Sequence, residues 1–183
     1  MESVKNLKTS KIIKYAFIAL VGSILLAISS KIKIPFYPVP MTMQTLVVIS
    51  IGVAFGWKLG LATISLYLFE GLIGLPIFSG TPEKGIGFIY FTGPTMGYLI
   101  GFLVAVYFAG KFNYNHNFIE TFFKLLFATS FIYLLGLAWL GFLIGLDKPI
   151  FKLGAQPFLL AELFKILIVT LAINQIKKFR KFI

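Results

Sequence analysis

Long apolar runs, separated by short segments that contain charges, glycine or proline, follow one another along the whole chain. A helix needs about 20 mostly apolar residues to cross the hydrocarbon core of a bilayer. Six runs come close to this length, and we interpret each of them as a membrane span. They cover residues 12–29, 41–56, 58–75, 93–110, 118–146 and 156–176. The pattern predicts an all-α integral membrane protein, a six-transmembrane-helix bundle that forms a single membrane domain over residues 1–183.

Composition supports this interpretation and excludes others. Hydrophobic residues make up 58% of the 183-residue chain and charged residues only 13%, with a mean hydropathy of +0.94. A soluble domain carries about 25% charged residues and needs them to cover its surface. A soluble enzyme and an intrinsically disordered chain are therefore both excluded. The chain has no cysteine, which excludes disulfides, thiolate metal sites and cysteine nucleophiles.

The net charge of +11 comes from 17 basic and 6 acidic residues, and its distribution predicts the orientation. In a soluble protein this excess would suggest nucleic acid, but in a membrane protein basic residues collect on the cytoplasmic side. With the N-terminus inside, eleven basic residues are cytoplasmic, five lie in outer loops, and Lys165 stands inside a span. The five are Lys31, Lys33, Lys84, Lys148 and Lys152. We therefore expect both termini to be cytoplasmic, with the lipid bilayer and not nucleic acid as the surroundings.

This topology brings polar residues from distant segments to one level in the outer half of the membrane. They are Gln44, Tyr67, Thr95, Tyr98, Glu162 and Lys165. A polar cluster near one face of a small bundle predicts a ligand pocket open to the outside. Glu70 lies at a similar level, and the sequence leaves open whether it belongs to the site or is an interfacial carboxylate.

Glu162 and Lys165 are the strongest single signal. A charge at the centre of a membrane helix costs about 2.5–3.5 kcal/mol even on insertion scales. Their i,i+3 spacing puts both on one helix face, so they either satisfy each other or grip a polar ligand group such as a ureido or a carboxylate. Lys33 and Lys84 in the outer loops are further candidates for an anionic tail.

Small residues recur every four positions in two spans. In residues 93–110 they are Gly93, Gly97, Gly101, Ala105 and Ala109, and in residues 12–29 they are Ala19, Ser23 and Ala27. Such stripes let helix backbones approach closely. We interpret the first stripe as packing within the bundle. For Ala19, Ser23 and Ala27, packing within the bundle and docking to a partner protein both remain open.

Signatures of catalysis are missing from the sequence. There is no G-x-x-x-x-G-K-[ST] phosphate loop and no H-E-x-x-H motif, and the acidic residues are all at least 13 positions apart. The chain is therefore expected not to be an enzyme and to hold no metal or cofactor. A membrane-embedded enzyme acting on lipid or acyl groups, and a facilitator that works alone, are the alternatives from other classes.

Four segments resemble motifs of the BioY family, the biotin-specific substrate-binding (S) components of energy-coupling factor (ECF) transporters. Residues 34–45, with the sequence IPFYPVPMTMQT, resemble the family's P-x-P-[ILVM]-T-x-Q-T signature. Residues 71–78 and 93–102 are similar to G-x-x-G-L-P-V-F and G-P-T-G-G-Y-L-x-G-F, with Ile77 and Met96 as departures. Pro157, Phe158, Glu162 and Lys165 are similar to P-F-x-x-x-D-L-x-K, with glutamate in place of aspartate.

The resemblance implies an S component in the cell membrane that captures biotin from outside, or, within the same class, another water-soluble vitamin. It implies that Glu162 and Lys165 contact the biotin head group and that Ala19, Ser23 and Ala27 meet a transmembrane coupling subunit. Two cytoplasmic ATPases would be the further partners. We also expect the connection 76–92 to act as a lid, because Gly80, Gly85 and Gly87 give its backbone freedom.

Overall fold

Helices form most of the computed structural model, which describes the backbone of residues 2–115 and 117–183 and the side chains of 11–115 and 117–183. Lys5, Lys8 and His116 therefore lie outside the described side chains. In chain order the elements are α1 (Glu2–Lys31), β1 (Lys33–Ile34), β2 (Met41–Thr42), α2 (Gln44–Leu72), α3 (Phe88–Phe91), α4 (Met96–Lys111), α5 (Phe118–Ile144), α6 (Ile150–Gly154), η1 (Gln156–Phe158), α7 (Leu159–Leu171), α8 (Ile173–Ile176) and η2 (Lys177–Lys181).

Within the described residues, four segments are long and apolar enough to cross a membrane. They are Lys11–Lys31, Gln44–Leu72, Phe118–Ile144 and Ile150–Leu171, and Met96–Lys111 is a shorter apolar helix. Large apolar side chains also cover the outside of the bundle: Phe17, Phe142 and Leu160 are 65%, 80% and 81% exposed. Such a surface requires an apolar solvent, so the chain is a multi-pass membrane protein.

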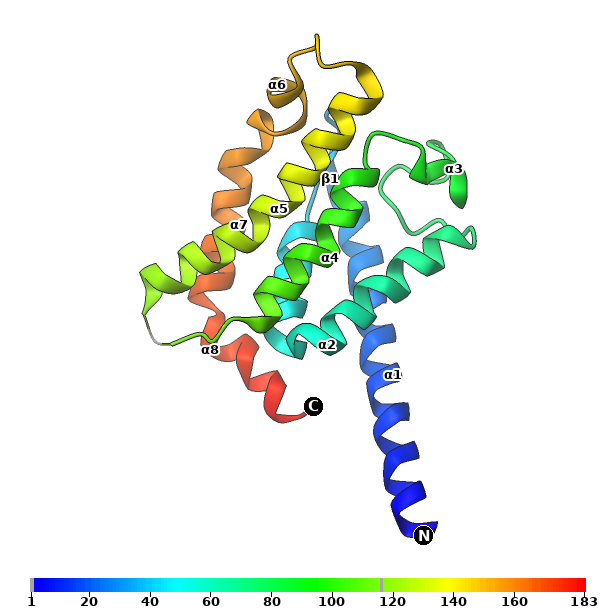
Figure 1. Cartoon of the computed structure of the whole chain (residues 1–183), viewed down its shortest axis with the longest axis vertical. Coiled ribbons are helices and arrows are strands. Elements are labelled where there is room, and N and C mark those ends of the chain that lie inside the picture. Colours follow the sequence, from blue (N-terminus) through cyan, green and yellow to red (C-terminus); the bar gives the residue numbers. More distant parts are fainter. Residues whose placement is uncertain (1, 116) are drawn as a thin grey trace.

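Helix α2 covers the two runs that the sequence predicts as separate spans, 41–56 and 58–75. No loop separates the two runs, but the backbone of Gly56 (φ 75°, ψ 172°) is not helical and divides α2 into two helical arms. Only glycine adopts this conformation readily. Figure 1 shows two arms of α2 that diverge from this bend, the first drawn in cyan and the second in blue-green. The boundary between the predicted spans is therefore a sharp bend at one glycine and not a loop.

The connection between α1 and α2 contains a short antiparallel β-ribbon. Lys33 pairs with Thr42 and Ile34 with Met41 in a two-stranded antiparallel sheet. The prolines between the strands lack backbone donors, so this segment cannot extend either neighbouring helix. As a result α2 begins at Gln44, three residues after the predicted start of the second span at Met41. The small sheet also corrects the expectation of a chain with helices alone.

The remaining boundaries shift by a few residues from the predicted ones. Helix α4 begins at Met96 and not at Gly93, because Gly93, Pro94 and Thr95 form the turn that leads into it. The predicted last span, 156–176, is divided into η1, α7 and α8, with a break at Ala172. Helix α6 precedes these elements and connects the loop after α5 to η1. The break shortens the continuous part of this segment to Leu159–Leu171.

Glycines let α4 lie close to its neighbours α2 and α5. A Cβ on Gly97 would come within 2.4 Å of both the Leu135 carbonyl oxygen and Trp139 Cβ, and one on Gly101 would lie 2.6 Å from Ile132 Cα. On the other side of α4, a Cβ on Gly110 would lie 2.4 Å from the Trp57 nitrogen. The predicted small-residue stripe of α4 therefore packs within the bundle, and at Gly97 and Gly101 only a hydrogen side chain fits.

The stripe on α1 is turned largely toward the chain's own helices. Ala19 and Ser23 are buried, at 6% and 1% exposure, and Ala27 is half-buried. Helix α1 packs mainly along α2, and Ser23 Oγ donates a hydrogen bond to the Glu70 carboxylate on that helix. Packing within the bundle thus occupies Ala19 and Ser23 in this conformation. Glu70 lies at this helix contact, away from the polar cluster.

Arg180 ties the C-terminal segment to the ends of two helices. Its Nε donates to the Val53 carbonyl (2.6 Å), and its Nη2 donates to the carbonyls of Gly52 (3.2 Å) and Gly110 (2.8 Å). The last carbonyls of a helix have no partner within the helix. The bend at Gly56 and the end of α4 create such carbonyls, and one guanidinium satisfies both sets.

Arg180→Ala is expected to lower the free energy of unfolding by about 2–3 kcal/mol, because carbonyls lose hydrogen bonds to a charged donor. Arg180→Lys keeps the charge but lacks the planar guanidinium, so its free energy of unfolding should lie between those of the wild type and Arg180→Ala. Thermal unfolding in detergent measures the effect, with Lys178→Ala, an exposed side chain in the same segment, as the control. Equal unfolding temperatures for Arg180→Ala and the control would contradict this role.

Candidate functional site

A cavity lies in the half of the bundle away from the C-terminus, where the first turns of α2, α4 and α7 meet. Segment 39–45, the connection after α2 and helix α5 complete its wall. In this structure it encloses about 50 Å³. Pockets for drug-sized ligands hold about 300–1,000 Å³, so a ligand of vitamin size needs some of the wall to move outward.

Glu162, Lys165 and Thr45 form a buried polar cluster at one end of the cavity. Lys165 Nζ donates to Glu162 Oε1 (2.5 Å), to Thr45 Oγ1 (3.1 Å) and to the Thr42 carbonyl (2.6 Å). Thr45 Oγ1 in turn donates to Glu162 Oε1 (2.9 Å). Both charged residues are only 5% exposed. An ammonium has three N–H donors, and here every one has an acceptor.

The second carboxylate oxygen of Glu162 is available to a ligand. Glu162 Oε2 and Ser79 Oγ are buried side-chain atoms that have no hydrogen-bond partner among the described residues, and both residues line the cavity. Buried polar atoms are nearly always paired, so two such atoms on residues of one cavity wall leave hydrogen-bonding capacity there for a water or a polar ligand. Lys165 itself does not line the cavity. It lies behind Glu162 and holds it in place.

Gln44 and Tyr67 connect the cavity to the segment that follows α2. Gln44 lines the cavity, and its Nε2 donates to the Tyr67 hydroxyl (2.8 Å). That hydroxyl donates to the Ile77 carbonyl (3.1 Å), while the ring packs edge-on against Phe78 with centroids 5.2 Å apart. Tyr67 is completely buried and does not line the cavity. Its contacts position Gln44 and the start of the connection 76–92.

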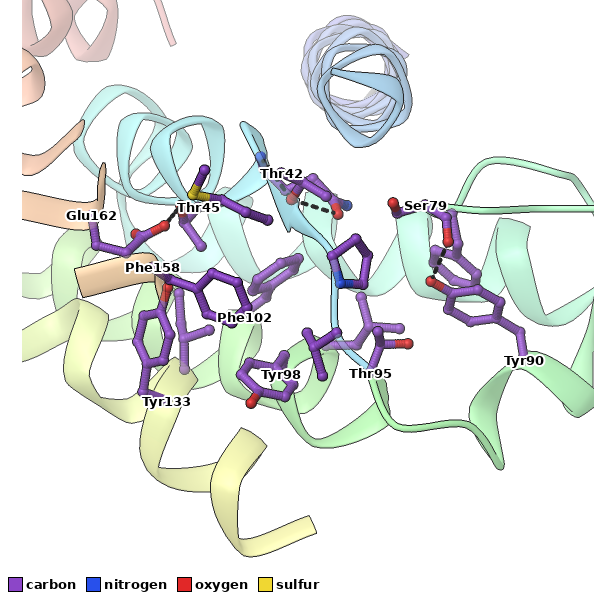
Figure 2. A pocket seen from close by; sticks show the side chains of 17 residues that line it. Thr42, Thr45, Ser79, Tyr90, Thr95, Tyr98, Phe102, Tyr133, Phe158 and Glu162 are labelled. Atoms are coloured by element: carbon purple, nitrogen blue, oxygen red, sulfur yellow. Dashed lines mark hydrogen bonds between the residues drawn. The ribbon is translucent and has the colours of Figure 1, made fainter. Parts of the chain in front are cut away.

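Aromatic rings form much of the wall between the polar ends. Tyr98 and Tyr133 pack edge-on with centroids 6.1 Å apart, and Phe158 lies 6.4 Å from Tyr133. The Tyr98 hydroxyl donates to the Gly154 carbonyl (2.8 Å), so it is satisfied within the protein. The Tyr133 hydroxyl is directed toward Glu162 (Figure 2). Rings in this arrangement suit a flat, weakly polar ring system.

The connection 76–92 lies over the cavity and contributes Phe78, Ser79 and Tyr90 to its wall. Phe78 stacks on Tyr90 with centroids 4.7 Å apart, and the Tyr90 hydroxyl donates to the Ser79 carbonyl (2.9 Å). Burial raises the pKa of Tyr90, so its hydroxyl keeps its proton and remains a donor. Aromatic stacking and hydrogen bonds thus hold this half of the connection against the bundle.

Four of the six predicted ligand-binding residues line the cavity: Gln44, Thr95, Tyr98 and Glu162. Tyr67 and Lys165 lie directly behind this wall. The sequence interpretation did not select Thr45, Ser79, Tyr133 and Phe158. Thr45 and Phe158 stand inside the motifs quoted above, so the motifs themselves contained that signal. Tyr133 sits in a long apolar run and Ser79 in a loop, where nothing in the pattern distinguishes them.

Among the described residues, no group of three or more His, Cys, Asp or Glu side chains comes together as a metal site would require. The cavity offers one carboxylate oxygen, hydroxyl groups and aromatic surface. This set of groups recognises a ligand by hydrogen bonds and ring contacts.

The fold and the site define a helical membrane protein with a small cavity between its helices. The family model described as "BioY family" matches residues 2–182, nearly the whole chain. The chain therefore belongs to the BioY family.

Known relatives and a solved structure agree with this assignment. The chain is 34% identical to a probable biotin transporter BioY from Pyrococcus horikoshii, over 77% of this chain and 82% of that protein. It is 32% identical to biotin transporter BioY2 from Lactococcus lactis subsp. cremoris, over 90% of each. Its fold is similar to the crystal structure of the S component for biotin from an ECF-type ABC transporter. That match has a TM-score of 0.75 and 25% identity, and covers 92% of this chain and 93% of the other.

Proposed function

We propose that this chain is the substrate-binding component of an ECF-type importer and that it captures biotin in the cavity between α2, α4, α5 and α7. The unpartnered Oε2 of Glu162 carries this proposal. Biotin's planar ureido group presents two N–H donors and a carbonyl, and its fused sulfur ring is apolar, which matches a buried carboxylate beside aromatic walls. The biotin transporters to which this chain is similar support the same ligand.

Lys165 supports this recognition from behind the wall. With all three N–H donors occupied, it fixes Glu162 Oε1 and leaves Oε2 facing the cavity. A ligand carbonyl would reach Lys165 Nζ by replacing its longest hydrogen bond, the one to Thr45 Oγ1 at 3.1 Å. Both residues are therefore part of the proposed head-group site, Glu162 as the direct acceptor and Lys165 as its counter-charge.

Binding of tritiated biotin to the detergent-purified protein tests the proposal. We expect saturable binding well below micromolar concentrations that other water-soluble vitamins do not compete away. Binding that is micromolar or weaker would overturn it, and competition by a different vitamin would reassign the ligand. Metal-dependent turnover of a lipid or acyl substrate would instead support the alternative of a membrane-embedded enzyme.

For the topology we propose six spans in the plasma membrane with both termini cytoplasmic. The two arms of α2 would be separate spans that meet at Gly56 on the cytoplasmic side, where Arg180 also binds both helix ends. The start of α1 and the C-terminus lie at one end of the molecule (Figure 1), as an even number of spans requires. Because the chain has no cysteine, the variants Lys84→Cys and Lys178→Cys carry single thiols. Impermeant maleimide should label only the first in intact cells.

The proposed partners are a transmembrane coupling subunit and two cytoplasmic ATPases, with α1 as the docking helix. Ala27 is the half-buried member of the stripe Ala19, Ser23 and Ala27, and exposed apolar side chains such as Phe17 and Ile24 flank it on the outer face of α1. Ala27→Phe should reduce co-purification with the coupling subunit and leave biotin binding intact. If uptake in cells does not require that subunit, the chain works as a facilitator.

We expect biotin to slow amide exchange in the connection 76–92. The cavity of about 50 Å³ is too small for the vitamin, and this connection forms the part of its wall with positive-φ glycines at 80, 85 and 87. Movement of the connection would admit the ligand, and closure over it would bury amides that exchange freely without it. Hydrogen exchange with and without biotin measures this, with the loop around Asp147 as an internal reference. Equal amide exchange with and without biotin would contradict the role of this connection as a lid.

A further inference from the structure

A groove of about 640 Å³ lies between α1 and the first arm of α2, with the C-terminal segment at one end of it. It has no lining residue in common with the cavity that contains Glu162. Lys14 and Ser50 are the polar side chains among the described residues of its wall. Ser50 Oγ donates to the Leu46 carbonyl (2.7 Å), so it needs no further partner. Apart from Lys14, the groove therefore has the surface that an apolar group requires.

The length of the groove matches one leaflet of a bilayer. On α1 its wall runs from Lys14 to Leu25, which is about 16 Å at a helix rise of about 1.5 Å per residue. Half of the hydrocarbon core measures about 15 Å. Lys14 contacts Phe182, near the C-terminus and toward the start of α1 (Figure 1), so the apolar wall begins where the basic end of the molecule stops. An acyl chain is the apolar group that a bilayer supplies along such a path.

The C-terminal segment presents three rows of side chains, because a 3₁₀ helix repeats every three residues. The first row lines the groove and consists of Ile176, Phe179 and Phe182. The second row, Lys177 and Arg180, donates hydrogen bonds to backbone carbonyls elsewhere in the chain. The third row, Lys178 and Lys181, is exposed. Two cations of this segment therefore remain available beside the groove.

Lys14 adds a third cation at this end, where its Nζ donates to the Phe182 carbonyl. Among the described residues, Lys14, Lys178 and Lys181 form no ion pair with a carboxylate. An apolar groove that ends at such cations is complementary to an anionic phospholipid, which has apolar chains and a negative phosphate. An apolar helix of another protein would match the groove but not these lysines. Charge complementarity therefore favours the lipid.

We propose that an anionic phospholipid occupies this groove, with one acyl chain between α1 and the first arm of α2 and its phosphate at Lys14, Lys178 and Lys181. The lipid bridges α1 and the C-terminal segment, the two elements that the hydrogen bond from Lys14 to Phe182 already joins. In the proposed topology it belongs to the cytoplasmic leaflet. The site is separate from the biotin cavity, so its occupation does not depend on the vitamin.

The test offers the delipidated, detergent-purified protein equal amounts of dioleoylphosphatidylglycerol and dioleoylphosphatidylcholine in mixed micelles. The two lipids have the same chains and differ in the net charge of the headgroup. After repurification, mass spectrometry measures the lipid that each protein retains. The wild type is expected to retain the anionic lipid with an enrichment of about fivefold or more. In Lys14→Gln/Lys181→Gln the enrichment should fall to about twofold or less.

A second variant tests the position of the acyl chain. Val21 lines the groove and is 40% exposed, so Val21→Trp fills the groove from its open side without disturbing the core. It should lower the amount of retained phosphatidylglycerol at least about twofold. Ile28→Trp is the matched control, because Ile28 is an exposed residue of α1 that does not line the groove. It should retain as much of this lipid as the wild type.

Lys58→Gln/Lys111→Gln is the control for charge, because both lysines are exposed and contact Trp57 and Tyr107 away from the groove. It should keep the wild-type enrichment, and all four variants should bind biotin as the wild type does. Equal retention of the two lipids by the wild type would overturn the proposal and leave the groove to an apolar helix of a partner protein. An equal loss of enrichment in the two lysine variants, or equal retention in the two tryptophan variants, would overturn it as well.

Discussion

Glu162→Gln is expected to weaken biotin binding by at least about 100-fold, because breaking a buried ion pair costs about 3–5 kcal/mol. The amide replaces one carboxylate oxygen by an N–H₂ group. If this N–H₂ group points into the cavity, it opposes the N–H donors of the ureido ring. If it points the other way, it disturbs the contacts with Thr45 and Lys165. It also leaves the Lys165 ammonium buried without its counter-charge. Equilibrium binding of tritiated biotin measures the loss.

Two further variants separate binding from folding. Glu120→Gln changes a partly exposed carboxylate that pairs with Lys124 on the surface of α5, and it should bind biotin within about twofold of the wild type. The double variant Glu162→Gln/Lys165→Met removes both charges, so it should unfold at a higher temperature than Glu162→Gln and still bind poorly. Wild-type affinity in Glu162→Gln would contradict the assignment of this carboxylate to the ligand.

Gly97→Ala is expected to lower the free energy of unfolding by about 3 kcal/mol. The new Cβ would meet the Leu135 carbonyl oxygen and Trp139 Cβ, both at 2.4 Å, and neither is the flexible end of a side chain. Helices α4 and α5 would therefore have to separate. Since both line the cavity, biotin affinity should fall too, and thermal unfolding in detergent with and without biotin reports both effects.

Ala138→Val is the matched control for this prediction. Ala138 lies on α5 one residue before Trp139, but its side chain is exposed on the outside of the bundle. The substitution adds two methyl groups where nothing confines them, so the unfolding temperature should stay close to that of the wild type. If Gly97→Ala behaves like this control, close packing at the α4–α5 contact does not limit stability.

Much of the site was predictable because membrane spans have few polar residues. In an apolar run each polar side chain stands out, and Gln44, Thr95, Tyr98 and Glu162 were selected in this way and line the cavity. The sequence interpretation was wrong about the start of the second span at Met41, because β1 and β2 pair before α2 begins. The apolar residues around Met41 predicted a helix, but in the structure Met41 and Thr42 pair with Ile34 and Lys33 across the proline-containing turn.

Hydropathy cannot tell which side of a span faces the bundle when both sides are apolar. Lipid and protein interior are equally apolar, so the periodicity that marks the buried face of a soluble helix is weak here. Tyr133 was missed for that reason. The same limitation leaves the stripe of Ala19, Ser23 and Ala27 open between packing and docking in the sequence, whereas the structure shows Ser23 in contact with Glu70 of α2.

The sequence by itself determined the class of protein, the apolar helices and the small set of polar residues within them. These follow from composition and local pattern, because a bilayer accepts only long apolar segments. Only the tertiary structure decided the roles within that set. It left Glu162 Oε2 without a partner in the cavity wall, put Lys165 and Tyr67 behind that wall, and brought Ser79 from a loop into the same wall. Those roles depend on distances between segments far apart in the chain, which no local pattern contains.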